Sequence, residues 1–383
     1  MSTFQSQYDE VTELLRFDDF SLVVKRIIDF TLDTEKIAFY KETATLLDWL
    51  DTNPTPQDIK QRAEALLKKL HSELISKPVH TGGAIVEGHD LRKKYSRSGF
   101  SLGPVNLSLN YGDIIGLVGE NGNGKTTLLR VLCGELKPDA GMLHYHFQHS
   151  DLYELRSKLI YIPQRTQTWY GPVLENLLFA ATCHGYSPEE SVLVTELLIA
   201  RMGLRKFRNH RWKDLSSGYK MRFELVRMLL RKPKILLIDE PLANLDIIAQ
   251  QTVLEDFRFI AKSPFRPLGI VLSSQQLYEV EKTSDQVIFL KQGVQKNLKN
   301  THQNAEETLP LVIEFESEWT QGILHEKLST IGTVNLQFNG GTYVATFGDK
   351  ATVNDFLSTV TAQNIPLTYF RDISNSTRRF FVS

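Results

Sequence analysis

One short segment of the chain has the residue types and spacing of a phosphate-binding loop. Residues 119–126 read GENGNGKT and fit the pattern G-x-x-x-x-G-K-[ST], between one apolar stretch that predicts a strand and another that predicts a helix. Glycines let backbone N–H groups converge on phosphate oxygens, and the start of the helix adds partial positive charge. A glycine-rich turn that binds nothing is the alternative.

The spacing assigns roles to individual residues of this loop. We expect Lys125 to reach the outer phosphates of a nucleotide and Thr126 to ligate a magnesium ion. The residues expected to bind the nucleotide here are Gly119, Asn121, Gly122, Gly124, Lys125, Thr126 and Thr127.

A second segment places two carboxylates directly after an apolar strand. Residues 234–240 read KILLIDE, so Asp239 and Glu240 follow four aliphatic residues that predict a buried strand. Two carboxylates at the end of such a strand need a cation or an exposed rim. We expect Asp239 to lie near the magnesium ion and Glu240 to lie beside the γ-phosphate. An ordinary exposed acidic pair is the alternative.

Residues 215–219 (LSSGY) form a third motif, between these two segments in the sequence. With all three motifs, residues 84–293 resemble the nucleotide-binding subunits of ATP-binding cassette (ABC) systems. The resemblance implies ATP and Mg²⁺ as ligands and ATP hydrolysis as the activity. It implies that Tyr95 stacks on adenine, although this ring could instead only fill a strand face. It implies that Gln164, within IPQR, is a catalytic and metal-sensing residue that also contacts the transport partner.

The resemblance also implies a dimer of cassettes. Ser216 and Gly218, at the start of the predicted helix that follows, would contact the γ-phosphate of ATP bound to a second cassette. Asp246 would close the seam between the two copies. The chain has one phosphate loop and one LSSGY signature, so it requires a second cassette. We expect a homodimer, with a heterodimer as the alternative.

Three positions depart from the pattern of the family. Ser217 stands where the family usually has glycine, and Tyr219 stands where it usually has glutamine. Gln275, within SSQQL, occupies the position of the catalytic switch histidine that touches the γ-phosphate. An amide can donate a hydrogen bond but cannot carry a positive charge or titrate near neutral pH. With Glu240 left to activate the attacking water, we expect hydrolysis that is retained but slow.

Apolar periodicity divides the chain into predicted domains. Residues 8–74 carry apolar residues at helical intervals, and the Thr55-Pro56 pair marks a helix start, so residues 1–80 predict an all-α accessory domain. Over residues 84–290, short apolar runs alternate with helical patterns, which is typical of α/β domains with a largely parallel sheet. We assign residues 81–300 to an α/β P-loop NTPase domain of the ABC type.

The polar residues 293–308 lack any apolar period and predict a linker. The tail then predicts, in chain order, strand 309–315, helix 319–331, strand 333–338, a turn at 339–341, strand 342–347, helix 352–362 and strand 366–370. This βαββαβ order is that of a ferredoxin-like α+β domain, which we place at residues 307–383.

Composition limits the partners and the compartment. The 383 residues include 44 Lys and Arg against 45 Asp and Glu, a net charge of -1, so no nucleic-acid partner is expected. Two cysteines, Cys133 and Cys183, argue against a disulfide framework. No apolar stretch is long enough to span a bilayer, so we expect a cytoplasmic protein. The basic residues between Arg201 and Lys213 predict a solvated helix end and loop, with an anion or lipid-headgroup patch as the alternative.

The leading hypothesis is therefore the energy-coupling ATPase of an ABC transporter, and an exporter in particular. A separate membrane-embedded permease would select the substrate and hold this chain at the inner face of the cell membrane. The alternatives are a soluble ABC ATPase that acts on ribosomes or nucleic acid, and a regulator in which Gln275 makes ATP a slow clamp.

Overall fold

The computed structural model describes residues 4–96, 99–243, 245–275, 277–296, 310–339, 341–348 and 351–374. The chain divides into two compact units. The first contains residues 1–275 and 283–295, and the second contains residues 276–282 and 296–383. In the described ranges, no helix combines the length and the hydropathy needed to cross a bilayer.

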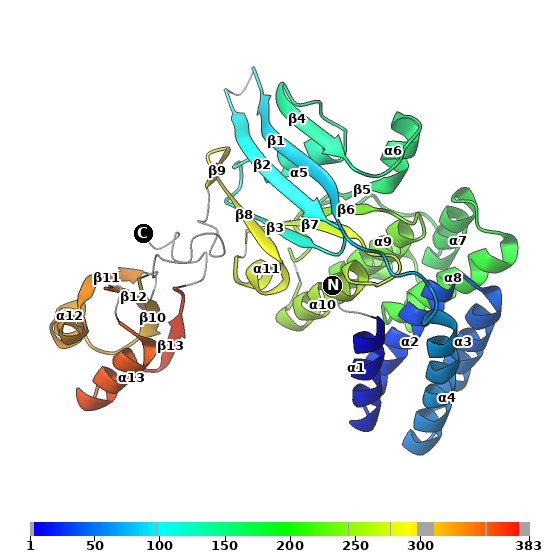
Figure 1. Ribbon diagram of the computed structural model, residues 1–383, viewed down its shortest axis with the longest axis horizontal. Coiled ribbons are helices and arrows are strands. Elements are labelled where there is room, and N and C mark those ends of the chain that lie inside the picture. Colours follow the sequence, from blue (N-terminus) through cyan, green and yellow to red (C-terminus); the bar gives the residue numbers. More distant parts are fainter. Residues whose placement is uncertain are drawn as a thin grey trace. The chain divides into compact units, whose positions relative to one another are not determined.

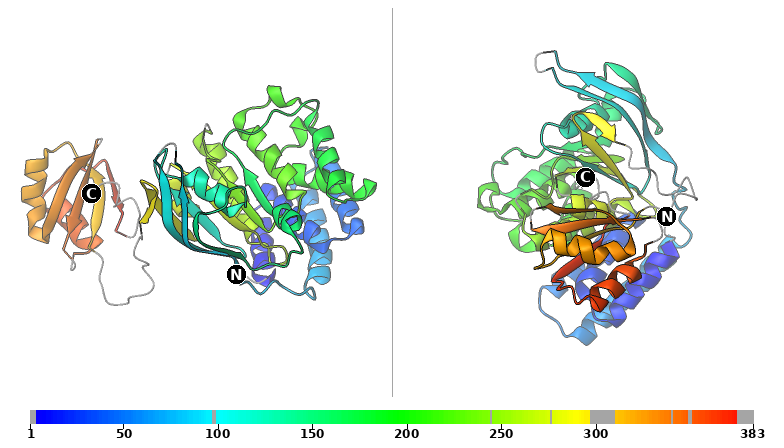
Figure 2. Two further views of the ribbon diagram at one scale, coloured as in Figure 1. Left: turned by 90° about the horizontal axis from the view of Figure 1, so that it is seen from above. Right: turned by 90° about the vertical axis from the view of Figure 1, so that its left-hand side faces the viewer.

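Four helices begin the first unit: α1 (Phe4–Arg16), α2 (Phe20–Thr34), α3 (Ile37–Leu50) and α4 (Pro56–Leu74). The predicted helix start at the Thr55-Pro56 pair is confirmed, because the Thr55 hydroxyl accepts a hydrogen bond from the Asp58 N–H at 3.3 Å. The four helices share one apolar core, to which Phe265 of the following α/β part also packs. Helices α2 and α3 pack against α8 (Pro188–Arg201), beside which they lie in Figures 1 and 2.

The α/β part contains a six-stranded sheet in the order β5-β6-β7-β3-β8-β9. Its strands are β3 (Ile114–Val118), β5 (Leu159–Ile162), β6 (Ile235–Ile238), β7 (Gly269–Ser274), β8 (Gln286–Lys291) and β9 (Val294–Lys296). The pairings from β5 through β8 are parallel, and every residue of β3, β6 and β7 is buried. The short apolar runs of the sequence therefore became central strands, as expected of a parallel sheet covered on both faces.

An antiparallel sheet in the order β2-β1-β4 packs beside the larger one (Figure 1). Its strands are β1 (Ala84–Lys94), β2 (Ser101–Asn110) and β4 (Ala140–Tyr145). The remaining helices are α5 (Lys125–Leu132), α6 (Leu152–Lys158), α7 (Val173–Cys183), α9 (Ser217–Leu229), α10 (Ile247–Ala261) and α11 (Leu277–Thr283). A shared core of aliphatic residues joins both sheets to α5.

The second unit contains a four-stranded antiparallel sheet in the order β11-β12-β10-β13. Its elements are β10 (Val312–Glu316), α12 (Gln321–Leu328), β11 (Thr333–Asn339), β12 (Thr342–Phe347), α13 (Val353–Ala362) and β13 (Tyr369–Asp372). The last strand begins three residues later than the sequence predicts. Gly340 of the predicted turn and residues 297–309 of the predicted linker lie outside the described residues, and β9 occupies the start of that predicted linker.

One expectation about the basic residues between Arg201 and Lys213 is wrong. Arg201, predicted to be solvated, is only 1% exposed. Its Nε donates to Asp29 at 2.8 Å, and its Nη1 donates to Asp256 at 2.7 Å. Helix periodicity alone could not reveal this, because Asp29 comes from α2 and Asp256 from α10, far away in the sequence.

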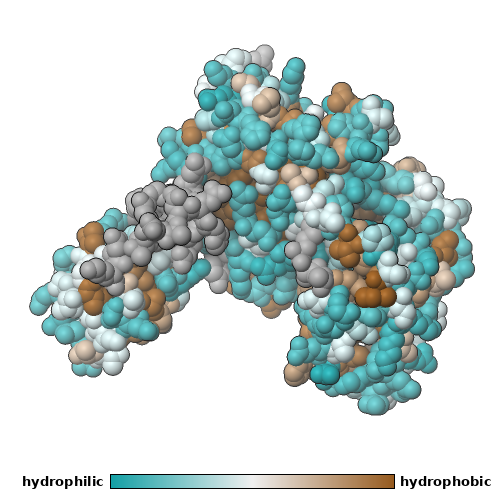
Figure 3. Space-filling model, viewed as in Figure 1, coloured by the Kyte–Doolittle hydropathy of each residue, from teal (hydrophilic) through white to brown (hydrophobic). Residues whose placement is uncertain are grey.

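The face drawn in Figure 3 is mostly hydrophilic, with hydrophobic residues in small patches.

Candidate active site

The loop from Gly119 to Gly124 connects β3 to α5 and needs glycine at two of its positions. Gly124 has a φ of +97° and is the N-cap of α5, so its backbone lies in the left-handed region that favours glycine. A Cβ at Gly119 would lie 2.5 Å from the Leu290 carbonyl oxygen on the neighbouring strand. Local sterics therefore require this sequence, and the loop presents the N-terminus of α5 to a cavity.

Lys125 is the first residue of α5, and its side chain folds back over the loop. Its Nζ donates hydrogen bonds to the carbonyl oxygens of Gly119 at 2.6 Å and Glu120 at 3.2 Å. The same Nζ lies 3.2 Å from Glu240 Oε1, in an ion pair whose side chains are 5% and 11% exposed. The Lys125 ammonium is thus held against the loop, beside the carboxylate of Glu240, which follows β6.

Asp239 follows β6 and is the centre of a buried hydrogen-bond network. Thr126 Oγ1 donates to its Oδ2 at 2.7 Å, and Ser273 Oγ donates to its Oδ1 at 2.6 Å. The Tyr161 hydroxyl donates to Oδ2 at 3.3 Å. Burial, followed by the nearby charge of Asp239, raises the pKa of Tyr161, which keeps this phenol a donor at neutral pH.

Glu240 adopts an unusual backbone conformation for a residue with a side chain. Its φ is +51°, in the left-handed region, and its N–H donates to Ser273 Oγ at 2.9 Å. Ser273 thus holds two successive residues, because it donates to Asp239 and accepts from Glu240. A strained conformation that its surroundings hold in place is frequent at functional sites.

A cavity of about 460 Å³ brings most of the predicted residues together. The predicted residues that line it are Tyr95, Asn121, Gly122, Gly124, Lys125, Thr126, Thr127, Gln164, Asp239 and Glu240. Phe100, which no motif of the sequence indicated, also lines the cavity, with its ring centroid 6.4 Å from that of Tyr95. The roles of Ser273 and Tyr161 were not predicted from the sequence either. Phe100 lies five residues after Tyr95, and Tyr161 lies three residues before Gln164, which is the only signal the sequence offered for them.

The residues predicted to act on a second copy lie elsewhere. Ser216 is the N-cap of α9 and accepts from the Tyr219 N–H at 3.5 Å. Asp246 is the exposed N-cap of α10 and accepts from the Ala249 N–H at 2.9 Å. A Cβ at Gly218 would lie 3.5 Å from a Leu245 methyl group, so the starts of α9 and α10 are neighbours.

A second cavity, of about 490 Å³, joins this region to the first one. Gln164 and Glu240 line both cavities, whereas Ser217 and Leu245 line only the second. Gln275 is exposed and does not line either cavity. Asn244, between the acidic pair and Asp246, lies outside the described residues.

The donors in the first cavity suit a nucleotide with magnesium. Backbone N–H groups at a helix start together with one lysine form a site for phosphate oxygens. The Thr126 hydroxyl and the Asp239 carboxylate, already 2.7 Å apart, are the hard oxygen ligands that Mg²⁺ prefers. The two aromatic rings of Tyr95 and Phe100 offer an apolar face for a base.

Comparison with known proteins agrees with this chemistry. Residues 102–243 match the family model described as ABC transporter. An uncharacterized ABC transporter ATP-binding protein of Bacillus subtilis (strain 168), YdbJ, is 28% identical over 242 residues, which cover 61% of this chain and 77% of that protein. The lipopolysaccharide export system ATP-binding protein LptB of Acidithiobacillus ferridurans is 29% identical over 216 residues, which cover 55% of this chain and 87% of that protein.

Relatives of the import type are also similar to this chain. The spermidine/putrescine import ATP-binding protein PotA of Mesoplasma florum is 30% identical over 217 residues, which cover 55% of this chain and 59% of that protein.

The solved structure of cbiO1 from Clostridium perfringens, part of the ABC transporter complex cbiONQ, has a TM-score of 0.52 at 24% identity. It covers 56% of this chain and 87% of that chain, and it shows the fold. Residues 102–243 therefore form an ABC ATPase domain of the kind found in the nucleotide-binding subunits of ABC transporters.

Proposed function

We propose that this ATPase couples ATP binding and hydrolysis to the movement of a substrate by a separate membrane-embedded permease. The observation that carries the proposal is the cavity in which the phosphate loop meets Asp239 and Glu240. An ion pair joins Lys125 to Glu240 there, and a hydrogen bond joins Thr126 to Asp239. Loop and strand end thus form one site.

Within this site we assign roles by chemistry. The loop N–H groups and Lys125 bind the phosphates, and Tyr95 receives the adenine ring. Thr126, Asp239 and Gln164 hold Mg²⁺, which neutralises charge on the phosphate oxygens when it is bound. Glu240 orients and deprotonates the attacking water, and the Ser273 hydroxyl holds the backbone of Glu240 in place.

The residues predicted to act on a second copy support a dimer. Ser216, Gly218 and Asp246 do not line the cavity of the phosphate loop in the described chain. Ser216 and Asp246 begin neighbouring helices at an exposed edge, where the two helix N-termini can meet the γ-phosphate held by a second copy. Closure would then be driven by the higher affinity of the closed dimer for ATP.

We further propose three domains: residues 1–80 all-α, residues 81–300 the ABC ATPase and residues 307–383 ferredoxin-like. Helices α1 to α4 support the first, although they share a compact unit with the cassette. The βαββαβ element order with the strand order β11-β12-β10-β13 supports the last.

For the direction of transport we propose export, which the similarity to the lipopolysaccharide export protein supports. A spermidine/putrescine import protein is also similar to this chain, so import is the alternative. On this proposal the protein is cytoplasmic and binds the inner face of the cell membrane through its permease.

The test is to capture the partners of a closed dimer. Tagged Glu240→Gln protein would be purified with ATP from gently solubilised membranes, since blocked hydrolysis should hold the closed state. We expect a multi-span membrane protein to co-purify, and to be lost from the matched Lys125→Ala sample, which cannot hold the phosphates. Ribosomes or nucleic acid without a membrane protein would overturn the transporter proposal.

A further inference from the structure

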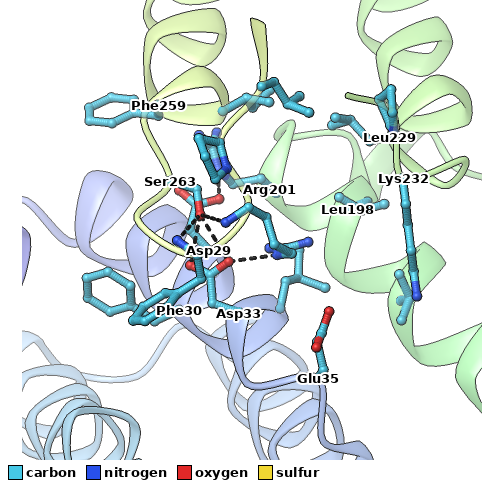
Figure 4. Close-up of a pocket in the computed structure, with 18 of the residues that line it drawn as sticks. Asp29, Phe30, Asp33, Glu35, Leu198, Arg201, Leu229, Lys232, Phe259 and Ser263 are labelled. Carbon is cyan, nitrogen blue, oxygen red and sulfur yellow. Dashed lines mark hydrogen bonds and ion pairs between the residues drawn. The ribbon is translucent and has the colours of Figure 1, made fainter. Parts of the chain in front are cut away.

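A third cavity, about 360 Å³ in volume, lies where the N-terminal helices meet the α/β part (Figure 4). It shares no lining residue with the cavity of the phosphate loop. Its walls come mainly from α2, α8, the connection from α9 to β6, the end of α10 and the segment that follows it. Its volume falls within the usual range of small-molecule sites.

The acidic groups of this cavity are already neutralised. Asp29 pairs with Arg201 at 2.8 Å, and Asp33 pairs with Arg266 at 2.7 Å. Glu35, the third carboxylate in the wall, pairs with Lys77 at 3.3 Å. Figure 4 shows Asp29, Asp33, Arg201 and Ser263 gathered at one side of the cavity. This side therefore carries little net charge toward a ligand.

The basic groups on the other walls have no such partners. Lys158, Lys232 and Lys234 also line the cavity, and none has an ion pair with a carboxylate of the described ranges. Lys232 Nζ lies over the ring of Tyr186, 4.8 Å from its centroid. Burial, and then the charge of Lys158, lower the pKa of Lys234, as expected of an ammonium that lacks a counter-charge.

Apolar side chains make up much of the remaining wall, which also includes Gln7, Arg26 and Ser263. Phe30 comes from α2, Leu198 from α8 and Phe259 from α10, so two rings and one aliphatic side chain line the cavity from three elements. At roughly 30 Å³ for each water-sized group, the cavity holds about a dozen non-hydrogen atoms. Unpaired lysines at one side of a partly apolar cavity of this size favour a small amphipathic anion.

We propose that this cavity binds a small organic anion, with its carboxylate or phosphate group on Lys232 and Lys234 and its apolar body against Phe30, Leu198 and Phe259. Such a ligand would bridge the N-terminal helices and the connection that leads into β6. The proposal does not depend on the transport function, because this cavity and the cavity of the phosphate loop share no lining residue.

The experiment is calorimetric titration of the full chain with ligands of one chain length. Octanoate, 1-octanol and octylamine are linear eight-carbon amphiphiles with different head groups, and phenyl phosphate distinguishes a phosphate from a carboxylate. All titrations contain ADP and magnesium, so that the phosphate loop does not compete for phenyl phosphate. We expect octanoate or phenyl phosphate to bind with a stoichiometry of one, at least about tenfold more tightly than octanol and more tightly still than octylamine.

Variants assign the binding to this cavity. The double substitution Lys232→Gln and Lys234→Gln should lower the affinity for the anion about tenfold or more and leave octanol unchanged. Because Lys232 is exposed, Lys232→Gln alone serves if the double variant is poorly folded. Lys60→Gln, which removes a lysine of α4 that does not line the cavity, should leave binding of the anion unchanged. The proposal is overturned if the double variant binds the anions as the native protein does, or if neither anion binds at about 1 mM.

Discussion

Lys125 Nζ and Glu240 Oε1 lie 3.2 Å apart, so the loop lysine and the carboxylate proposed as the base form one buried ion pair. The same ammonium is the group that would bind the outer phosphates of ATP. Glu240 and the phosphates therefore compete for one cation, and the carboxylate adds a negative charge beside them.

This ion pair predicts how removal of the negative charge of Glu240 changes nucleotide binding. Glu240→Gln should raise the affinity for a non-hydrolysable ATP analogue by about threefold to tenfold, or about 1 kcal/mol, because Lys125 is freed and a like charge is removed. Equilibrium binding with Mg²⁺ present measures the effect. Glu255→Gln, an exposed carboxylate on α10, is the matched control and should bind as the native protein does. Unchanged or weaker binding by Glu240→Gln would show that the pair does not oppose ATP.

Ser273 offers a second prediction, because its hydroxyl serves both carboxylate residues. Ser273→Ala removes the donor to Asp239 and the acceptor for the Glu240 N–H. We expect kcat to fall by about tenfold or more with little change in KM, and the free energy of unfolding to fall by about 1–3 kcal/mol. Ser273→Thr keeps the hydroxyl and should recover most of kcat. A native kcat in Ser273→Ala would exclude a positioning role.

Gln275 predicts a tunable rate, although in this structure it lines neither cavity. Gln275→His restores the side chain that the family resemblance implies at this position, and a histidine can carry positive charge, so we expect ATP hydrolysis to become severalfold faster. The increase should be larger below about pH 6.5, where an ordinary imidazole is protonated. Steady-state phosphate release at several pH values tests this. Slower hydrolysis by the histidine form would contradict the hypothesis that the neutral glutamine limits the rate.

Lys234 predicts a pH dependence of stability. Its pKa is lowered below its ordinary value of about 10.5, first by burial and then by Lys158. Below the lowered pKa both folded and unfolded states are protonated there, so over that range the folded protein carries the full cost of the half-buried ammonium. As the pH rises from the lowered pKa toward 10.5, the folded state loses this proton first, and stability is gained.

Lys234→Gln should therefore be more stable than the native protein at pH 7, and the difference should shrink as the pH approaches 10.5. Urea unfolding of both proteins at pH 7 and pH 10 measures it. Comparing the difference between the two proteins cancels the titration of other groups. A native protein that is more stable than Lys234→Gln at pH 7 would mean that Lys234 already has a counter-charge.

Local patterns were enough to find the phosphate loop and the acidic strand end. Gly119 to Thr126 and Asp239-Glu240 are contiguous segments whose chemistry does not depend on the rest of the chain. The role of Ser273 could not be found in this way. It follows from the sheet order, in which β7 lies between β6, which leads to Asp239, and β3, which leads to the loop. Periodicity predicts strands but not which strand lies next to which.

The same reasoning explains the buried Arg201 and the third cavity, which α2, α8 and α10 line. Both depend on the packing of α2 against α8 and α10, elements that are separated by more than 150 residues. A basic residue at a helix end is usually solvated, so composition favoured the wrong environment for Arg201. Only the tertiary structure shows that Asp29 and Asp256 lie on either side of it.

The central claim, that Glu240 activates water at an ATP site in this cavity, is tested most directly by phosphate release from the purified full chain with ATP and Mg²⁺. We predict hydrolysis by the native protein and by Glu255→Gln, a loss of about 100-fold or more in Glu240→Gln, and binding of ATP by all three. Hydrolysis by Glu240→Gln at the native rate, or a native rate no higher than that of Lys125→Ala, would contradict the account.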